Sequence, residues 1–159
     1  MNAQARIPPA TCDVTVTRVF DAPRDLVFRT WTEPAHLARW WGPSGFVNPV
    51  CEIDARVGGK ILVHMHGPDG RRVLMTGAFR EIAAPERLVI AAIAADRDGH
   101  PTFEGLITAT FEDDDGKTKL TVREQAVALV PEAARVLANM QNSWTESLGR
   151  LATVVSPDR

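Results

Sequence analysis

The C-terminal part of the chain, from Val130 onward, carries the pattern that most constrains the fold. It opens with Val130-Pro131-Glu132, and a proline in the first turn is typical of a helix start. Apolar side chains then recur at spacings of three and four residues, which predicts one apolar face on a helix over residues 131 to about 154. This face comprises Leu137, Met140, Trp144, Leu148, Leu151 and Val155. Polar residues, among them Arg150, occupy the opposite face. A helix of this kind, about 35 Å long, needs an apolar surface on which to lie.

Between Phe46 and about Gln125 the pattern changes to short strands separated by turn sequences. Apolar and β-branched residues alternate with polar ones, and glycine or proline ends each run. The turn sequences are Val57-Gly58-Gly59, Gly67-Pro68-Asp69-Gly70, Ala84-Pro85-Glu86, Asp98-Gly99-His100-Pro101 and Asp113-Asp114-Asp115-Gly116. These breaks predict six antiparallel strands, and an earlier strand that ends at Phe20 brings the total to seven. Two short helices follow that first strand; Trp31 lies on one and Trp40 on the other.

Several short motifs occur in an order that is hard to obtain by chance. They are Phe20-Asp21-Ala22-Pro23, Trp40-Trp41-Gly42-Pro43, Asp54-Ala55-Arg56-Val57-Gly58-Gly59, Pro85-Glu86-Arg87-Leu88-Val89 and Trp144 with Leu148 and Leu151. From about Cys12 to Val155 the chain resembles the SRPBCC superfamily of START-like and birch-pollen-allergen-like proteins. Within it, the chain is similar to the C-terminal domain of the activator of heat-shock-protein-ninety ATPase. The resemblance implies an α+β helix-grip fold: a seven-stranded curved antiparallel sheet wrapped around a long C-terminal helix, with two short helices after the first strand.

The chain of 159 residues has the usual size of one domain. We expect a disordered arm over residues 1–11, a single domain over 12–155 and a tail over 156–159. With 18 Lys+Arg against 20 Asp+Glu, the net charge of −2 provides no basic field for nucleic acid. No apolar run reaches the roughly 18 residues of a membrane span, and the N-terminus lacks the apolar run of a secretory signal. We therefore expect a cytoplasmic protein without membrane contact, in which Cys12 and Cys51 are buried free thiols.

A set of aromatic and methionine side chains is a candidate lining for an internal cavity. Its members are Trp40, Trp41, Phe46, Met65, Met75, Phe79, Phe103, Met140 and Trp144. Flexible methionines beside rigid aromatic rings suit an adaptable apolar pocket, although the same residues also suit a plain packed core. Small residues at Ala91, Ala92 and Ala94, where relatives often carry larger ones, would leave volume for such a cavity.

Glu124 is the candidate residue for an acid–base role or for hydrogen bonding to a ligand. Counting by two from Leu120 and Val122 places it on the inward side of the last strand. Buried there, it would orient a polar group of a ligand, or act as an acid or base in the manner of cyclase-like relatives. Because unpaired carboxylates are rarely buried, we favour the alternative, in which Glu124 is exposed or paired with an arginine.

The sequence predicts neither a metal nor another cofactor. His64 and His66 alternate on one side of a strand, but a third ligand is missing, and paired surface histidines explain them more simply. Glu33 and His36 have the spacing of helical metal ligands without the second such pair that a di-metal site needs. The segment Asp96-Arg97-Asp98-Gly99 is typical of a turn rather than of a calcium loop.

We therefore expect a protein that binds a small apolar or aromatic molecule between the sheet and the C-terminal helix, and the sequence identifies no catalysis. The resemblance alone also implies a co-chaperone role on heat-shock-protein-ninety ATPase. Against that role, only about eleven residues precede the expected fold, where the full-length activator has a separate domain. A third alternative is an enzyme related to polyketide cyclases and aromatases, with Glu124 as its acid or base. The oligomeric state stays open.

Overall fold

The computed structural model of the protein describes residues 8–156. Most of the predicted arm (1–11) and of the predicted tail (156–159) lies outside the described residues. Strand pairing already includes the last residues assigned to the arm. The N–H of Ala128 donates to the carbonyl of Ala10 at 2.8 Å, and strand β1 begins at Thr11.

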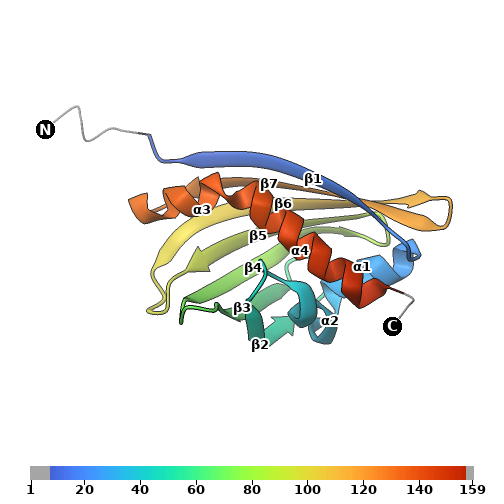
Figure 1. Ribbon diagram of the computed structural model, residues 1–159, viewed down its shortest axis with the longest axis horizontal. Helices are drawn as coiled ribbons and strands as arrows, with labels where there is room; N and C mark the ends of the chain where they lie inside the picture. The colour runs from blue at the N-terminus through green and yellow to red at the C-terminus, as the bar shows by residue number, and fades with distance from the viewer. Residues whose placement is uncertain (1–7, 157–159) are drawn as a thin grey trace, which may run out of the picture.

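Seven strands form one antiparallel sheet in the order β1-β7-β6-β5-β4-β3-β2. They are β1 (Thr11–Phe20), β2 (Val47–Ile53), β3 (Lys60–His66), β4 (Arg72–Ala83), β5 (Arg87–Ala95), β6 (Pro101–Asp114) and β7 (Lys117–Ala128). Hairpins connect β2 through β7, while the first strand pairs with the last at the edge of the sheet. Figure 1 shows the C-terminal helix lying across the curved sheet. The predicted seven-stranded helix-grip architecture is confirmed.

Side-chain alternation along β3 decides which residues enter the core. Ile61, Val63 and Met65 are buried beneath the helical layer, as their spacing predicts. The residues between them, including His64 and His66, point to the other face of the sheet and are only half-buried. The two histidines therefore lie away from the side that faces the helices.

Two short helices follow β1, as predicted, and lie near the C-terminal end of the last helix (Figure 1). They are α1 (Arg24–Thr32) and α2 (Pro34–Trp40). Glu33, between them, has an extended backbone, and Pro34 occupies the first position of α2, where its missing N–H removes no helical hydrogen bond. Trp31 and Trp40 project from the two helices into the core.

The C-terminal helix is broken at Asn139, which corrects the predicted continuous helix over residues 131–154. It consists of a 3-10 turn (Pro131–Ala133), α3 (Ala134–Ala138) and α4 (Met140–Val155). At Asn139 the backbone has φ −100° and ψ 8°, and its N–H is shared between the carbonyls of Arg135 and Val136. Asparagine is a weaker helix former than alanine or leucine, which favours a break at this position. The apolar stripe nevertheless continues, since Leu137 on α3 and Met140 on α4 are both buried.

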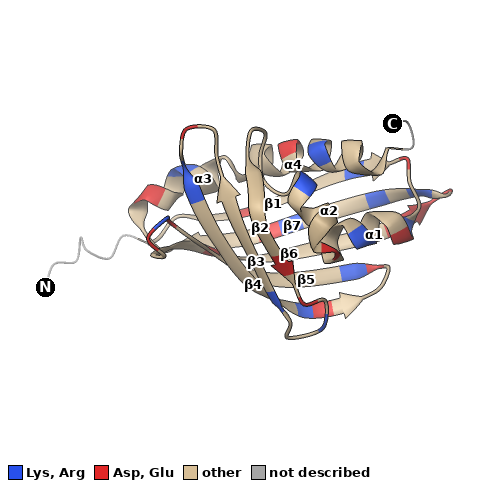
Figure 2. Cartoon of the chain, turned by 90° about the horizontal axis from the view of Figure 1, so that it is seen from below, with Lys and Arg blue, Asp and Glu red and all other residues tan. Residues whose placement is uncertain are grey.

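The surface carries charges of both signs, spread over helices, strand ends and hairpins (Figure 2). None of the helices within residues 8–156 is long and apolar enough to cross a membrane. Cys12 and Cys51 are free thiols, as predicted, but both are half-buried rather than fully buried.

Shortening a side chain in the stripe of α4 tests this packing. Leu148 is 1% exposed, so Leu148→Ala should leave a cavity and lower the free energy of unfolding by about 2–5 kcal/mol. Denaturant melts measure the loss. Gln141→Ala, on the exposed face of the same helix, should change it by less than about 0.5 kcal/mol. Equal losses in the two variants would contradict burial of this face.

Candidate ligand pocket

A pocket of about 350 Å³ lies between the inner face of the sheet and the helical layer. This volume falls at the lower end of the usual range for small-molecule sites. Residues of both α3 and α4 line it, so the pocket spans the helix break at Asn139. Seven of the predicted lining side chains meet there: Trp41, Phe46, Met65, Met75, Phe103, Met140 and Trp144.

Trp40 and Phe79, also predicted to line a cavity, are not part of this pocket. Both are fully buried in the core. The Trp40 indole N–H donates to the carbonyl of Thr30 at 3.0 Å, which holds the ring between α1 and α2. Phe79 lies on β4 opposite Ile90, in the adjoining part of the core. These two side chains are therefore structural.

Small side chains on β5 leave part of the pocket volume, but not all three predicted alanines contribute. Ala92 and Ala94 line the pocket. Ala91 lies between Ile90 and Ala92 in the strand, so its side chain points to the opposite face of the sheet. The expected contribution of Ala91 to this pocket is wrong because strand alternation turns it away.

Glu124 is 5% exposed and lines the pocket from β7. Its Oε1 accepts a hydrogen bond from the indole N–H of Trp144 on α4, with a distance of 2.8 Å. Gly105 on the neighbouring strand makes room for the carboxyl, since a Cβ there would collide with Oε2. The favoured interpretation, an exposed or arginine-paired Glu124, is wrong because the indole supplies a donor inside the core.

Burial raises the pKa of Glu124 to about 7, while the hydrogen bond from Trp144 opposes part of this rise. The same carboxyl affects Cys12 on the adjacent strand β1. The pKa of that thiol is raised, first by its own burial and then by the negative charge of Glu124. Glu124 therefore changes its protonation state near neutral pH, within an apolar pocket wall.

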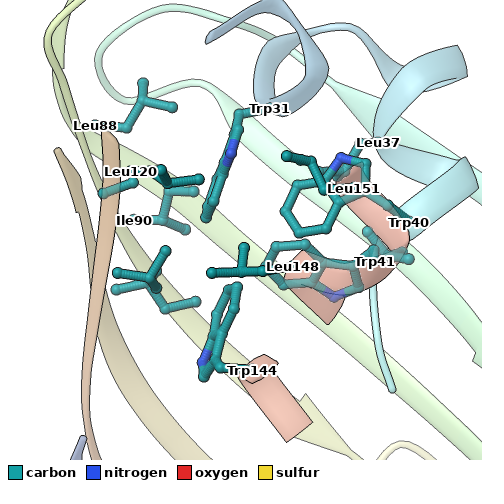
Figure 3. Packing of buried hydrophobic residues seen from close by; sticks show 14 of the residues in the cluster. Trp31, Leu37, Trp40, Trp41, Leu88, Ile90, Leu120, Trp144, Leu148 and Leu151 are labelled. Carbon is teal, nitrogen blue, oxygen red and sulfur yellow. The ribbon is translucent and has the colours of Figure 1, made fainter. Parts of the chain in front are cut away.

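The four tryptophans of the chain form one cluster that holds Trp144 in place (Figure 3). The ring of Trp144 stacks on Trp31, with 5.9 Å between centroids and an interplanar angle of 10°. Trp41 meets the Trp144 ring edge-on at 5.5 Å, and Trp40 packs against Trp31 at 4.9 Å. Aromatic pairs prefer such stacked and edge-to-face arrangements. The orientation of the indole N–H toward Glu124 is thus fixed by packing against two rings, Trp31 and Trp41.

Arg150 positions the loop that forms one wall of the pocket. Its guanidinium donates from Nη1 to the carbonyls of Trp41, Gly42 and Pro43, and from Nη2 to that of Phe46, at 2.9–3.1 Å. The helical periodicity predicts Arg150 on the solvent face and does not indicate this role. The available signal was a turn rich in glycine and proline, whose carbonyls have few partners within the turn itself. Burial lowers the pKa of Arg150 from its usual value.

Gly42 fits this wall for two reasons. Its φ of +95° lies in a region that other residues adopt only with strain. A Cβ at this position would also lie 2.9 Å from the Met65 side chain and 3.4 Å from Phe46. The glycine therefore lets the loop turn closely over two side chains that line the pocket.

Of the side chains considered as metal ligands, Asp96 alone lines the pocket. Nδ1 of His36 and Oε1 of Glu33 are 3.3 Å apart in a partly exposed pair. Within residues 8–156, Asp96, Asp98 and His100 are the one group of at least three potential ligands that lie close together. Asp96 Oδ1 accepts the backbone N–H groups of the other two, so this exposed cluster is explained by its turn.

The sequence matches the model of one protein family, and the fold matches several solved structures. The model of the family described as "Activator of Hsp90 ATPase homolog 1-like protein" matches residues 21–156. A solved structure from Arthrobacter aurescens is 27% identical, with a TM-score of 0.78 over 91% of this chain and 86% of that one. One from Chromobacterium violaceum is also 27% identical, with a TM-score of 0.73 over 92% and 98% of the two chains. No curated protein matches the sequence.

A structure described as the AHSA1 protein from Silicibacter pomeroyi is 21% identical, with a TM-score of 0.76 over 93% of this chain and 100% of that one. At this identity the similarity concerns the fold alone. The curved sheet and long C-terminal helix are therefore shared among several bacterial proteins of different sequence.

The raised pKa of Glu124 predicts a specific dependence of stability on pH. An unfolded glutamate titrates near 4.5 and the folded one near 7, so the folded state binds more protons between these values. Stability from this group is complete below about pH 4.5. It falls by on the order of 3 kcal/mol as the pH rises through about 7. Glu124→Gln should lack this loss, so its stability relative to the parent protein should increase with pH.

Urea melts at several pH values between 4.5 and 8 measure the effect. Glu104→Gln is the matched control, because Glu104 is an exposed carboxyl on the neighbouring strand β6. This control should follow the parent protein at each pH. Parallel stability profiles for Glu124→Gln and the parent would contradict the raised pKa.

Proposed function

The chain belongs to the family of activator of Hsp90 ATPase homolog 1-like proteins, and we propose that it binds a small apolar or aromatic molecule in the pocket beside Trp144. The observation that carries this proposal is the pocket itself. A pocket beside a closely packed core lowers stability, because its lining lacks the contacts that neighbouring atoms would provide. A ligand of matching shape would restore those contacts.

The character of the lining supports an apolar guest. Three flexible methionines, Met65, Met75 and Met140, contribute to it beside the rigid rings of Trp41 and Trp144. Methionine adapts to irregular shapes and makes favourable contacts with aromatic rings. Apart from Glu124, the charged residues of the lining are partly or fully exposed: Arg71, Arg72, Asp96 and Glu132. The buried part of the wall therefore fits a planar or partly cyclic apolar molecule. Within the described residues Glu124 is the one charged side chain of the buried core, so we assign no reaction to the pocket.

Ligand binding predicts a thermal shift that depends on pocket volume. A ligand from a panel of flavonoid-like, polyketide-like and lipid compounds should raise the melting temperature and perturb the indole resonance of Trp144. At about one hundred times the dissociation constant the gain is about 2.7 kcal/mol, or about 5–10 °C for a domain of this size. Met140→Trp should fill the same volume and abolish both responses while the fold persists.

Gln141→Trp provides the matched control, because it adds the same ring to the exposed face of α4. This variant should bind as the parent protein does. If no compound of the panel shifts either the melting temperature or the Trp144 resonance, the residues around the pocket are plain core and the proposal is overturned.

The family description favours a second function, activation of an Hsp90 ATPase. The test adds the purified chain to the ATPase at stoichiometric and excess amounts. A saturable, several-fold rise in turnover that survives Met140→Trp would support this activity independently of the pocket. Unchanged turnover would count against it and leave ligand binding as the proposed function.

A further inference from the structure

The carboxyl of Glu124 has one free hydrogen-bonding oxygen at the pocket. Oε1 accepts the indole N–H of Trp144, whereas Oε2 has no hydrogen-bond partner in the described part of the chain. Oε2 is also not one of the fully enclosed unpaired atoms of that part. Because Glu124 lines the pocket, this oxygen keeps contact with the open space there.

The structure holds the carboxyl in one place. Trp144 fixes Oε1, and stacking on Trp31 fixes Trp144. The absence of a side chain at Gly105 leaves the space that Oε2 occupies. A buried carboxyl with only one neutral donor is expensive to maintain, since polar groups lose their hydration on burial. A hydrogen-bond partner for Oε2 would offset much of this lost hydration.

A second unpaired polar group lies on the helical side of the pocket. Ser147 is 5% exposed, lines the pocket, and its side-chain hydroxyl makes no hydrogen bond within the described residues. It lies three residues after Trp144 and therefore on the same side of α4. Among the residues that line the pocket, Glu124 and Ser147 are the two buried polar ones, and they come from two elements, β7 and α4.

We propose that the ligand of this pocket is an apolar or aromatic molecule that carries a hydroxyl group, and that Glu124 Oε2 forms a hydrogen bond with that hydroxyl. The inference rests on the proposed binding function and narrows its ligand class. Glu124 is then a residue that determines specificity for the ligand.

A hydroxyl suits this carboxyl better than other polar groups do. An ionised carboxylate only accepts hydrogen bonds, whereas a protonated carboxyl also donates one. Both forms of Glu124 are populated near neutral pH. A ligand carbonyl would pair only with the protonated form, because it needs a donor, and an ammonium group would pair best with the ionised form. A hydroxyl both donates and accepts, so it pairs with either form.

Two probes of similar shape test the inference: 2-naphthol, and 2-methylnaphthalene, which has a methyl group in place of the hydroxyl. Titration calorimetry should show that the parent protein binds 2-naphthol about ten-fold or more tightly, as expected for a hydrogen bond to a buried carboxyl. Glu124→Leu should reduce this ratio to about one while still binding 2-methylnaphthalene. Glu124→Gln, which keeps polar atoms at this position, should retain part of the preference.

Glu104→Gln is the matched control, because Glu104 is an exposed carboxyl on the neighbouring strand β6 that does not line the pocket. This variant should keep the ratio of the parent protein. A direct measurement requires no variant at all: 2-naphthol should shift the side-chain carboxyl carbon resonance of Glu124 in the parent protein more than 2-methylnaphthalene does. This resonance shift tests the inference even if Glu124→Leu fails to fold.

The outcomes separate this inference from the proposed function. If both probes bind the parent protein with equal affinity, or if the preference for 2-naphthol persists in Glu124→Leu, Glu124 does not select the hydroxyl and the inference is overturned. Ligand binding itself would then still stand. If neither probe nor any compound of the wider panel binds the parent protein, the proposed function and the inference both fail.

Discussion

The contact between Trp144 and Glu124 determines how the C-terminal helix sits on the sheet. The indole N–H reaches the carboxyl on β7, while the ring stacks on Trp31 and meets the edge of Trp41. Trp144 of α4 therefore contacts three parts of the molecule: the sheet, helix α1 and the loop that follows α2. This contact therefore joins the helix to the sheet beside the pocket, and both of its residues belong to the pocket wall.

A buried carboxyl is an unusual choice for that contact if stability alone were at issue. An apolar residue at position 124 would avoid the loss of hydration that raises the pKa to about 7. Gly105 adds a second cost, since a glycine within a strand has more freedom to lose and no side chain to pack. Two neighbouring strands thus both depart from what stability favours, and they do so at the pocket. Residues that lower stability at one place are typical of sites kept for function.

The sequence predicted those features that depend on a regular pattern along the chain. Alternation in β3 and the apolar stripe of the last helix place Val63 and Leu148 in the core, as found. The helix break at Asn139 was missed because one residue leaves the stripe almost unchanged. The environment of Glu124 was missed for another reason: its partner, Trp144, lies on a different element, and a period-two count gives the side of the strand but not the donor opposite. The role of Arg150 was not predicted for the same reason, since its hydrogen-bond partners are backbone carbonyls far away in sequence.

The pocket and the core share one element, which constrains how either can change. α4 provides Met140 and Trp144 to the pocket, Leu148 and Leu151 to the core, and Arg150 to the loop that forms the pocket wall. A shift of this helix would alter the indole contact and the loop together, so binding and stability are coupled through it. Strand β2 is less involved in this coupling, because it lies at the edge of the sheet farthest from β7. Substitutions that change ligand preference without loss of the fold are therefore best made at side chains such as Met65 and Met75. These line the pocket from strands and take no part in the hydrogen bond of Glu124.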